Sequence, residues 1–180
     1  MFRILTREML TPNICKMEVE APRIAKAALP GQFLIVRPNE KGERIPLTIS
    51  DYDIEKGTVT IVTQLIGASS AAIIATQEGE FFNDVVGPLG NPSAFVGMSD
   101  EELKGKKYIF IAGGVGTAPV YPQAKWLHEK GVAVDVIIGA KTKDLLIYKE
   151  ELGSVCDNLY LCTDDGSEGF KGLVTALLEK

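Results

Sequence analysis

The segment from Tyr108 to Pro119, with the sequence Tyr-Ile-Phe-Ile-Ala-Gly-Gly-Val-Gly-Thr-Ala-Pro, constrains the fold more than any other part of the chain. Residues 108–112 are apolar and rich in β-branched and aromatic side chains, which is typical of a buried parallel strand. The turn that follows contains three glycines: Gly113, Gly114 and Gly116. Because glycine has no Cβ, a phosphate-bearing ligand can approach the backbone of this turn closely.

A helix is predicted after this turn, over residues 118–129. Pro119 suits the first turn of a helix, where its missing N–H costs nothing. The N-terminus of such a helix presents free N–H groups and a positive dipole to an anion. The pattern departs from the dinucleotide-binding fingerprint, because Pro119 stands where that motif has its third glycine. Two interpretations therefore remain open at this point: a nucleotide site, or glycines that only allow a helix to pack tightly on a strand.

Composition excludes several classes of protein. With 180 residues and 46% apolar content, the chain can form one good-sized domain or two small ones. The net charge is −5 and the lysines are scattered, so a nucleic-acid-binding surface is not expected. The apolar runs are too short to cross a bilayer and the N-terminus lacks the features of a signal peptide, so we expect a cytoplasmic protein without a membrane segment. Three cysteines form no CxxC pair and are expected to be buried thiols, not metal ligands: Cys15, Cys156 and Cys162.

The first half of the chain has β character. Short β-prone segments recur between turn residues, at 14–19, 33–36, 47–49, 58–65 and 84–86. Residues 16–20 and 58–63 alternate polar and apolar side chains, as strands do when one face is exposed to water. These features predict an antiparallel domain, a small β-barrel over residues 1–92, interrupted by one short helix at 69–75 with Ser69 or Ser70 as its N-cap.

The second half follows a different rhythm after the turn-forming residues 87–92. Strands and helices alternate: strands at 108–112, 133–138 and 158–162, and helices at 118–129, 144–152 and 171–179. This alternation predicts right-handed βαβ units and a parallel sheet. The expected fold class is therefore β + α/β, with an antiparallel barrel followed by a parallel α/β lobe over residues 93–180.

The segment Glu43–Ser50 is the strongest candidate for chemistry in the first half. Backbone groups at a β edge can read the pyrimidine rim of an isoalloxazine, the Thr48 hydroxyl could reach the flavin N5 region, and Arg44 could neutralise a pyrophosphate. The alternative is a strand end with a solvated arginine and an edge proline. Residues 67–70 could supply further N–H donors to the same phosphates, or they could form an ordinary helix cap.

The order and spacing of these segments together resemble the ferredoxin–NADP reductase superfamily over essentially the whole chain. Gly-x-Gly-x-Ala-Pro follows the first strand of the nicotinamide lobe in that superfamily. The branch with the strongest resemblance contains the small FAD subunit of NADH-dependent reduced ferredoxin:NADP oxidoreductases and the electron-transfer subunit of type B dihydroorotate dehydrogenases. The motifs that carry the resemblance are 30–33, 44–50, 62–64, 67–70, 86–90, 113–119, 138–140 and 163–167.

The resemblance implies two sets of binding residues. The set expected to contact FAD is Arg44, Pro46, Leu47, Thr48, Val62, Thr63, Gln64, Gly67, Ser69 and Ser70, with Thr48 closest to the chemistry. The set expected to contact NAD(H) or NADP(H) is Gly114, Gly116, Thr117, Gly139, Ala140, Asp164, Asp165 and Gly166. One position departs from the family pattern, because the family's arginine lies three residues before the hydroxyl residue and that position here is Ile45.

The implied activity is hydride transfer from NAD(P)H to FAD, followed by passage of electrons to an iron–sulfur partner. The expected partners are a large iron–sulfur flavoprotein subunit and ferredoxin. The chain ends after the helix at 171–179, where the family continues with further strands and a cysteine cluster, so a truncated lobe is expected, with residues 108–112 at a sheet edge and a [2Fe–2S] centre only in a longer parent chain. Alternatives are an electron-transfer subunit of dihydroorotate dehydrogenase, a non-catalytic flavin- or nucleotide-binding docking module, and a flavin-free structural protein. Lys141 and Lys143 could attract the 2′-phosphate of NADP or be solvated turn residues, so the preferred nucleotide stays open.

Overall fold

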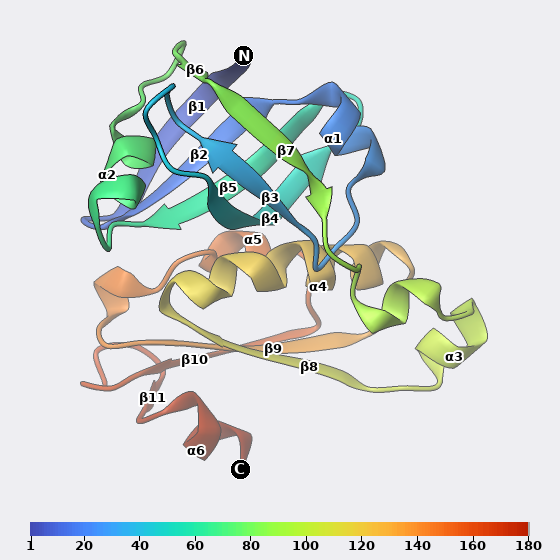
Figure 1. The fold of residues 1–180 in the computed structure, drawn as a ribbon. Helices are drawn as coiled ribbons and strands as arrows, with labels where there is room; N and C mark the ends of the chain where they lie inside the picture. Colours follow the sequence, from blue (N-terminus) through green and yellow to red (C-terminus); the bar gives the residue numbers. More distant parts are fainter. Residues whose placement is uncertain (180) are drawn as a thin grey trace. The chain divides into compact units, whose positions relative to one another are not determined.

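The computed structural model describes residues 1–179, and the chain divides into two compact units, residues 1–93 and residues 94–180. The first unit is an antiparallel seven-stranded sheet with the strand order β6-β1-β2-β5-β4-β3-β7 (Figure 1). Its strands are β1 (Phe2–Thr11), β2 (Ile14–Glu20), β3 (Phe33–Arg37), β4 (Ile45–Asp53), β5 (Thr58–Gln64), β6 (Phe81–Phe82) and β7 (Asp84–Leu89). Only Asn83 separates β6 from β7, although these strands form the two edges of the sheet. The sheet therefore curls into a nearly closed barrel, which confirms the predicted fold of this half.

Alternation along the strands builds the barrel core. Met17 pairs with Ile61 and Val19 pairs with Val59 across β2 and β5, and all four side chains are buried. Leu34, Ile49 and Phe82 add fully buried side chains from other strands. Burying a side chain of this size contributes about 1.5–3 kcal/mol each. The polar residues between these positions face outward, as the predicted alternation requires.

Two short helices complete the first unit, α1 (Pro22–Ala27) and α2 (Ala68–Ala75). The sequence predicted α2 but not α1, whose six residues are too few to show helical periodicity. The predicted N-cap of α2 was wrong: the cap is Gly67, and Ser70 reaches back from the first turn so that its Oγ accepts the N–H groups of Ile66 and Gly67 at 2.9 and 3.0 Å.

The second unit is a parallel sheet with the order β11-β10-β9-β8, which confirms the predicted α/β architecture. Its strands are β8 (Tyr108–Gly113), β9 (Val134–Ala140), β10 (Asn158–Thr163) and β11 (Phe170–Lys171). Strand β8 lies at an edge, as expected. The central strand β9 buries Val134, Val136 and Ile138, because it has neighbours on both sides.

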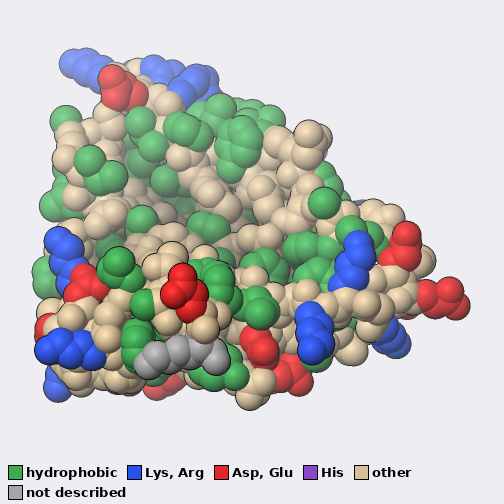
Figure 2. Space-filling model, turned by 90° about the horizontal axis from the view of Figure 1, so that it is seen from below, with side chains coloured by type: hydrophobic (Ala, Val, Ile, Leu, Met, Phe, Trp, Pro, Cys, Tyr) green, Lys and Arg blue, Asp and Glu red, His purple; other side chains and the backbone are tan. Residues whose placement is uncertain are grey.

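Helices cover both faces of this sheet unequally. The helices are α3 (Asp100–Lys104), α4 (Tyr121–Glu129), α5 (Lys149–Gly153) and α6 (Val174–Leu178), with 3-10 helices η1 (Ala94–Gly97), η2 (Gly114–Val120) and η3 (Lys143–Leu145). Figure 1 shows α4 and α5 on one face and the short α6 on the other. Next to α6, Ile109 and Tyr160 stay 51% and 44% exposed. Figure 2 shows acidic and basic side chains interspersed on the side of the molecule that it presents, without a concentrated basic surface.

The helix predicted over 118–129 begins later than expected. Residues 114–120 form the 3-10 helix η2, and the α-helix starts at Tyr121 with Pro122 in its first turn. Pro122 has no N–H to donate to a carbonyl four residues earlier, so it cannot lie inside an α-helix that starts at residue 118. Pro122, and not Pro119 as predicted, is therefore the proline of the first turn of the α-helix. The predicted helix at 144–152 is likewise divided, into η3 and α5.

The burial of the cysteines and the lengths of the helices bear on two expectations from the sequence, buried thiols and no membrane segment. Cys15 and Cys162 are buried as predicted, whereas Cys156 is only half-buried. Burial is the main cause that raises the pKa of all three thiols, so they are protonated at neutral pH. Within residues 1–179, no helix combines the length and the apolar character that crossing a bilayer requires.

Candidate functional site

The outer face of the barrel brings together part of the predicted flavin set. Strand β4 pairs with β3 so that Leu47 lies opposite Leu34, which is fully buried, and Thr48 lies opposite Phe33. Leu47 packs against the barrel core. Successive side chains of a strand point to opposite faces, so Pro46 and Thr48 lie together on the outside.

Strand β5 continues this outer surface. Ile49 pairs with Ile61, which sets β5 beside β4, and the core position of Ile61 places Val62 and Gln64 outside. Thr63 lies opposite Cys15 and is 3% exposed, and its hydroxyl has no hydrogen-bond partner among the described residues. The predicted flavin set therefore divides by face: four side chains share the outer face, although Val62 is only 7% exposed there, whereas Leu47 and Thr63 can contribute to it only through their backbone.

The N-terminus of helix α2 follows strand β5 closely along the chain. Three residues separate the end of β5 from α2, and nothing lies within 4 Å of the position that a Cβ on Gly67 would take. The first turn of α2 contains no acidic residue, so its own helix leaves the N-terminal dipole uncompensated. The Ser69 hydroxyl instead donates a hydrogen bond to the carboxylate of Glu43. A negative oxygen from the segment before β4 is thus already bound where phosphates were expected.

Arg44 lies in a different environment from the one that the sequence suggested. Its Nη1 atom is 2.6 Å from Oδ2 of Asp84, and this exposed ion pair joins the residue before β4 to the start of β7. The sequence did not identify Glu43 as the partner of Ser69 or Asp84 as the partner of Arg44. Asp84 lies 40 residues away from Arg44 in the chain. The available signal for Glu43 was an acidic residue directly before the expected phosphate-binding arginine.

The predicted nucleotide residues lie at the carboxyl ends of the parallel strands β8, β9 and β10 and in the segments that follow them. Gly113 pairs with Gly139 across β8 and β9, and Thr163 pairs with Ala140 across β9 and β10. The segments after these strand ends contain the remaining residues of the set, Gly114, Gly116, Thr117, Asp164, Asp165 and Gly166. Ligands of open parallel sheets bind outside the carboxyl ends of the strands, which is where this set lies.

The glycines near these strand ends have different physical roles. A Cβ added to Gly114 or Gly116 would meet nothing within 4 Å, and Gly114 has a positive φ of 55°. A Cβ on Gly139 would instead lie 2.5 Å from Cγ1 of Val174 and 2.9 Å from Sγ of Cys162. Space for a ligand therefore exists at Gly114 and Gly116, whereas the missing Cβ of Gly139 is needed for packing inside the chain. Thr117 is buried and contributes few side-chain atoms to the surface.

The loops after β9 and β10 are tied to each other. The Lys143 N–H donates to Oγ of Ser167 at 2.8 Å, and the Asp164 N–H donates to the Ala140 carbonyl at 3.1 Å. The Ser167 hydroxyl and N–H both donate to Asp165, and these bonds hold the pKa of Asp165 below its usual value. Asp165 is therefore a carboxylate at neutral pH. No cluster of three or more His, Cys, Asp or Glu side chains that could bind a metal occurs within residues 1–179.

Comparisons with known proteins support the observed fold. The chain is 39% identical over 177 residues to the dihydroorotate dehydrogenase B (NAD(+)), electron transfer subunit homolog of Thermotoga maritima, with 98% of this chain and 60% of that protein covered. It is 30% identical over 180 residues to the dihydroorotate dehydrogenase B (NAD(+)), electron transfer subunit of Bacillus cereus strain Q1, with 98% of this chain and 67% of that protein covered. No protein-family model matches the chain.

A solved structure shows the same fold. A chain of the NADH-dependent reduced ferredoxin–NADP oxidoreductase superimposes with a TM-score of 0.87 and 37% identity, and the match covers 98% of this chain and 61% of that one. The chain spans about three fifths of the length of curated relatives that it matches. The chain belongs to the ferredoxin–NADP reductase superfamily, in the branch that contains the electron-transfer subunits of dihydroorotate dehydrogenase B.

Proposed function

We propose that the chain is part of a flavoprotein electron-transfer subunit that passes electrons between NAD(P)H, FAD and an iron–sulfur partner. The observation that carries this proposal is the shared outer face of Pro46, Thr48, Val62 and Gln64, with the N-terminus of α2 following β5 closely along the chain. We assign residues 1–92 to FAD and residues 93–180 to the nicotinamide nucleotide. A bound flavin can take up a hydride and pass its electrons on singly, so the protein needs no acid–base triad.

The first unit would hold FAD mainly by shape and by fixed hydrogen-bonding groups. Thr48 places one hydroxyl beside the apolar Pro46 and Val62 on this outer face, where a donor or acceptor has a strong effect on a flavin ring. Gly67 and the first turn of α2 would accept the pyrophosphate, which requires Glu43 to leave Ser69. The residues present fit the cofactor, because the surface combines apolar contacts with free N–H groups at a helix N-terminus.

The second unit would hold the nicotinamide nucleotide at the carboxyl ends of β8, β9 and β10. Gly114 and Gly116 leave the backbone open to the dinucleotide, and the linked loops at Ala140 and Asp164 form the neighbouring edge. The proposed partners are a large iron–sulfur flavoprotein subunit and ferredoxin. A dihydroorotate dehydrogenase catalytic subunit is the alternative partner, which the names of the Thermotoga and Bacillus relatives favour.

Thr48→Val tests the flavin assignment. Valine keeps the β-branched shape but removes the hydroxyl, so we expect the variant to fold and bind FAD while flavin reduction by NADH slows by about tenfold or the flavin absorbance bands shift. Stopped-flow absorbance and a visible spectrum measure both effects. Thr6→Val is the matched control, because Thr6 is an exposed threonine on β1. A spectrum and a rate identical to those of the unmodified protein would remove Thr48 from the site.

Arg44→Gln and Asp84→Asn separate two roles of the arginine. If Arg44 binds the pyrophosphate, Arg44→Gln should weaken FAD binding by about tenfold, whereas Asp84→Asn should tighten it by releasing the guanidinium. Titration of apoprotein with FAD, followed by flavin fluorescence, gives both dissociation constants. Because the pair is exposed, each change should alter the free energy of unfolding by about 1 kcal/mol at most. Equal weakening by both substitutions would show that the ion pair acts only in the fold.

A further inference from the structure

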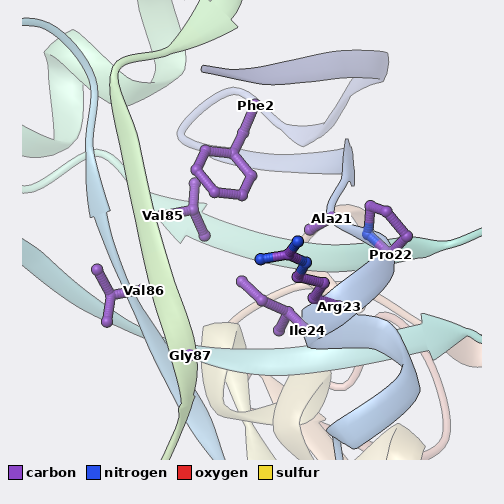
Figure 3. A pocket seen from close by; sticks show the side chains of 8 residues that line it. All are labelled: Phe2, Ala21, Pro22, Arg23, Ile24, Val85, Val86 and Gly87. Atoms are coloured by element: carbon purple, nitrogen blue, oxygen red, sulfur yellow. The ribbon is translucent and has the colours of Figure 1, made fainter.

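A pocket lies in the first unit and is lined by none of the residues assigned to FAD. It has a volume of about 380 Å³ and lies between helix α1, the start of β1 and the middle of β7 (Figure 3). Its lining residues are Phe2, Ala21, Pro22, Arg23, Ile24, Val85, Val86 and Gly87. In Figure 1, α1 and α2 lie on opposite sides of the barrel, so a ligand here would not contact the start of α2. The volume is within the range of small-molecule sites.

The walls of this pocket are apolar and fixed by the barrel core. Ala21, Ile24 and Val85 are at most 5% exposed and belong to the core cluster. Phe2 packs against the same cluster and pairs with Phe82 across β1 and β6. Because these side chains pack against the barrel core, the pocket exists before any ligand binds. An apolar group that enters it does not need to reorganise the walls.

Arg23 is the one charged residue of the lining, and it is exposed to solvent at the rim of the pocket. Figure 3 shows its guanidinium extending between Phe2 and Ile24, toward Val85. Within residues 1–179, the Arg23 side chain has neither an ion pair nor a hydrogen bond. A guanidinium beside apolar walls binds a planar carboxylate well, because two parallel N–H groups can donate to its two oxygens. The lining contains no acidic side chain that could compete for this position.

We propose that this pocket binds a medium-chain alkyl monocarboxylate, with the carboxylate on Arg23 and the alkyl chain against Phe2, Ile24 and Val85. A single cation favours a ligand with one negative charge, since a polyanion would leave charge unpaired beside apolar walls. The apolar share of the lining favours an alkyl tail over a sugar or a nucleotide. The proposal is independent of the flavin site, because it uses none of the residues assigned to FAD.

Calorimetric titration of the 180-residue chain with sodium octanoate tests the proposal. We expect one octanoate to bind per chain, binding to weaken about tenfold in Arg23→Gln, and Arg23→Lys to recover part of the affinity. Lys26→Gln is the matched control, because it removes the same charge from an exposed position on α1 outside the pocket. 1-Octanol, which has the same chain without the charge, should bind at least tenfold more weakly.

Each other outcome would overturn the proposal. Absence of octanoate binding would exclude the site, and equal binding to Arg23→Gln or equal binding of octanol would show that Arg23 does not recognise a carboxylate. An unfolding curve for each variant, measured by circular dichroism, separates loss of the site from loss of the fold. FAD titration of the same samples should be unchanged by octanoate, because the pocket uses none of the residues assigned to FAD.

Discussion

Gly116→Val is expected to slow flavin reduction by NADH about a hundredfold while the protein keeps its flavin and its fold. A Cβ at this position would meet nothing within 4 Å, so the added Cβ itself causes no clash in the protein. It would instead fill the space through which we propose that the dinucleotide passes, and a displacement of about 1 Å in a bound substrate can cost about a hundredfold in rate. Stopped-flow reduction at several NADH concentrations measures the effect.

Gly97→Val provides the matched control for this prediction. Gly97 lies in η1 of the same unit, and a Cβ there would also meet nothing within 4 Å, but it is far in sequence from the strand ends that carry the proposed site. Its reduction rate should therefore stay unchanged. The nucleotide assignment of Gly116 fails if Gly116→Val reduces its flavin at the normal rate, and a parallel loss of flavin and helix signal would indicate misfolding instead.

Much of the fold follows from local patterns that short stretches of sequence contain. The alternation at 16–20 predicts which side chains face the barrel core, and the apolar run at 108–112 predicts a parallel strand. At 58–63 the alternation is correct for Val59 and Ile61 but wrong for Thr63, which is polar and lies on the core side. Helix boundaries were less accessible. Pro119 and Pro122 are both compatible with a first helical turn, and only the packed structure decides that η2 occupies residues 114–120 before α4 begins.

The candidate site was predictable as an order of segments but not as a set of side chains. Family resemblance groups Leu47 with Thr48 and Thr63 with Gln64, yet adjacent residues of a strand face opposite sides, so half of each pair lies toward the core. The contacts of Glu43 with Ser69 and of Arg44 with Asp84 join residues 26 and 40 positions apart. Pairings of that length depend on the closed barrel, and no local pattern indicates them.

Gly139→Ala tests a glycine that the resemblance assigns to the nucleotide, whereas a Cβ there would press on neighbouring side chains of the chain itself. We expect this substitution to lower the free energy of unfolding of the second unit by about 2 kcal/mol, because the new methyl group would press on Val174 and Cys162. For a unit of this size the corresponding fall in Tm is about 10 °C. Differential scanning calorimetry measures it, and the first unit should keep its flavin.

A second substitution identifies the cause of that loss. Val174→Ala removes the Cγ1 atom that lies 2.5 Å from the added Cβ, so combining it with Gly139→Ala should restore part of the lost stability, although Val174→Ala alone is neutral or destabilising. A double-mutant cycle gives the coupling between the two positions. If residue 139 is glycine only to let the nucleotide approach, Gly139→Ala will leave the Tm unchanged and will slow reduction by NADH. Adding Val174→Ala will then not restore the reduction rate. That outcome would contradict the packing role of Gly139, because it would require more room between Val174 and Gly139 than the structure shows.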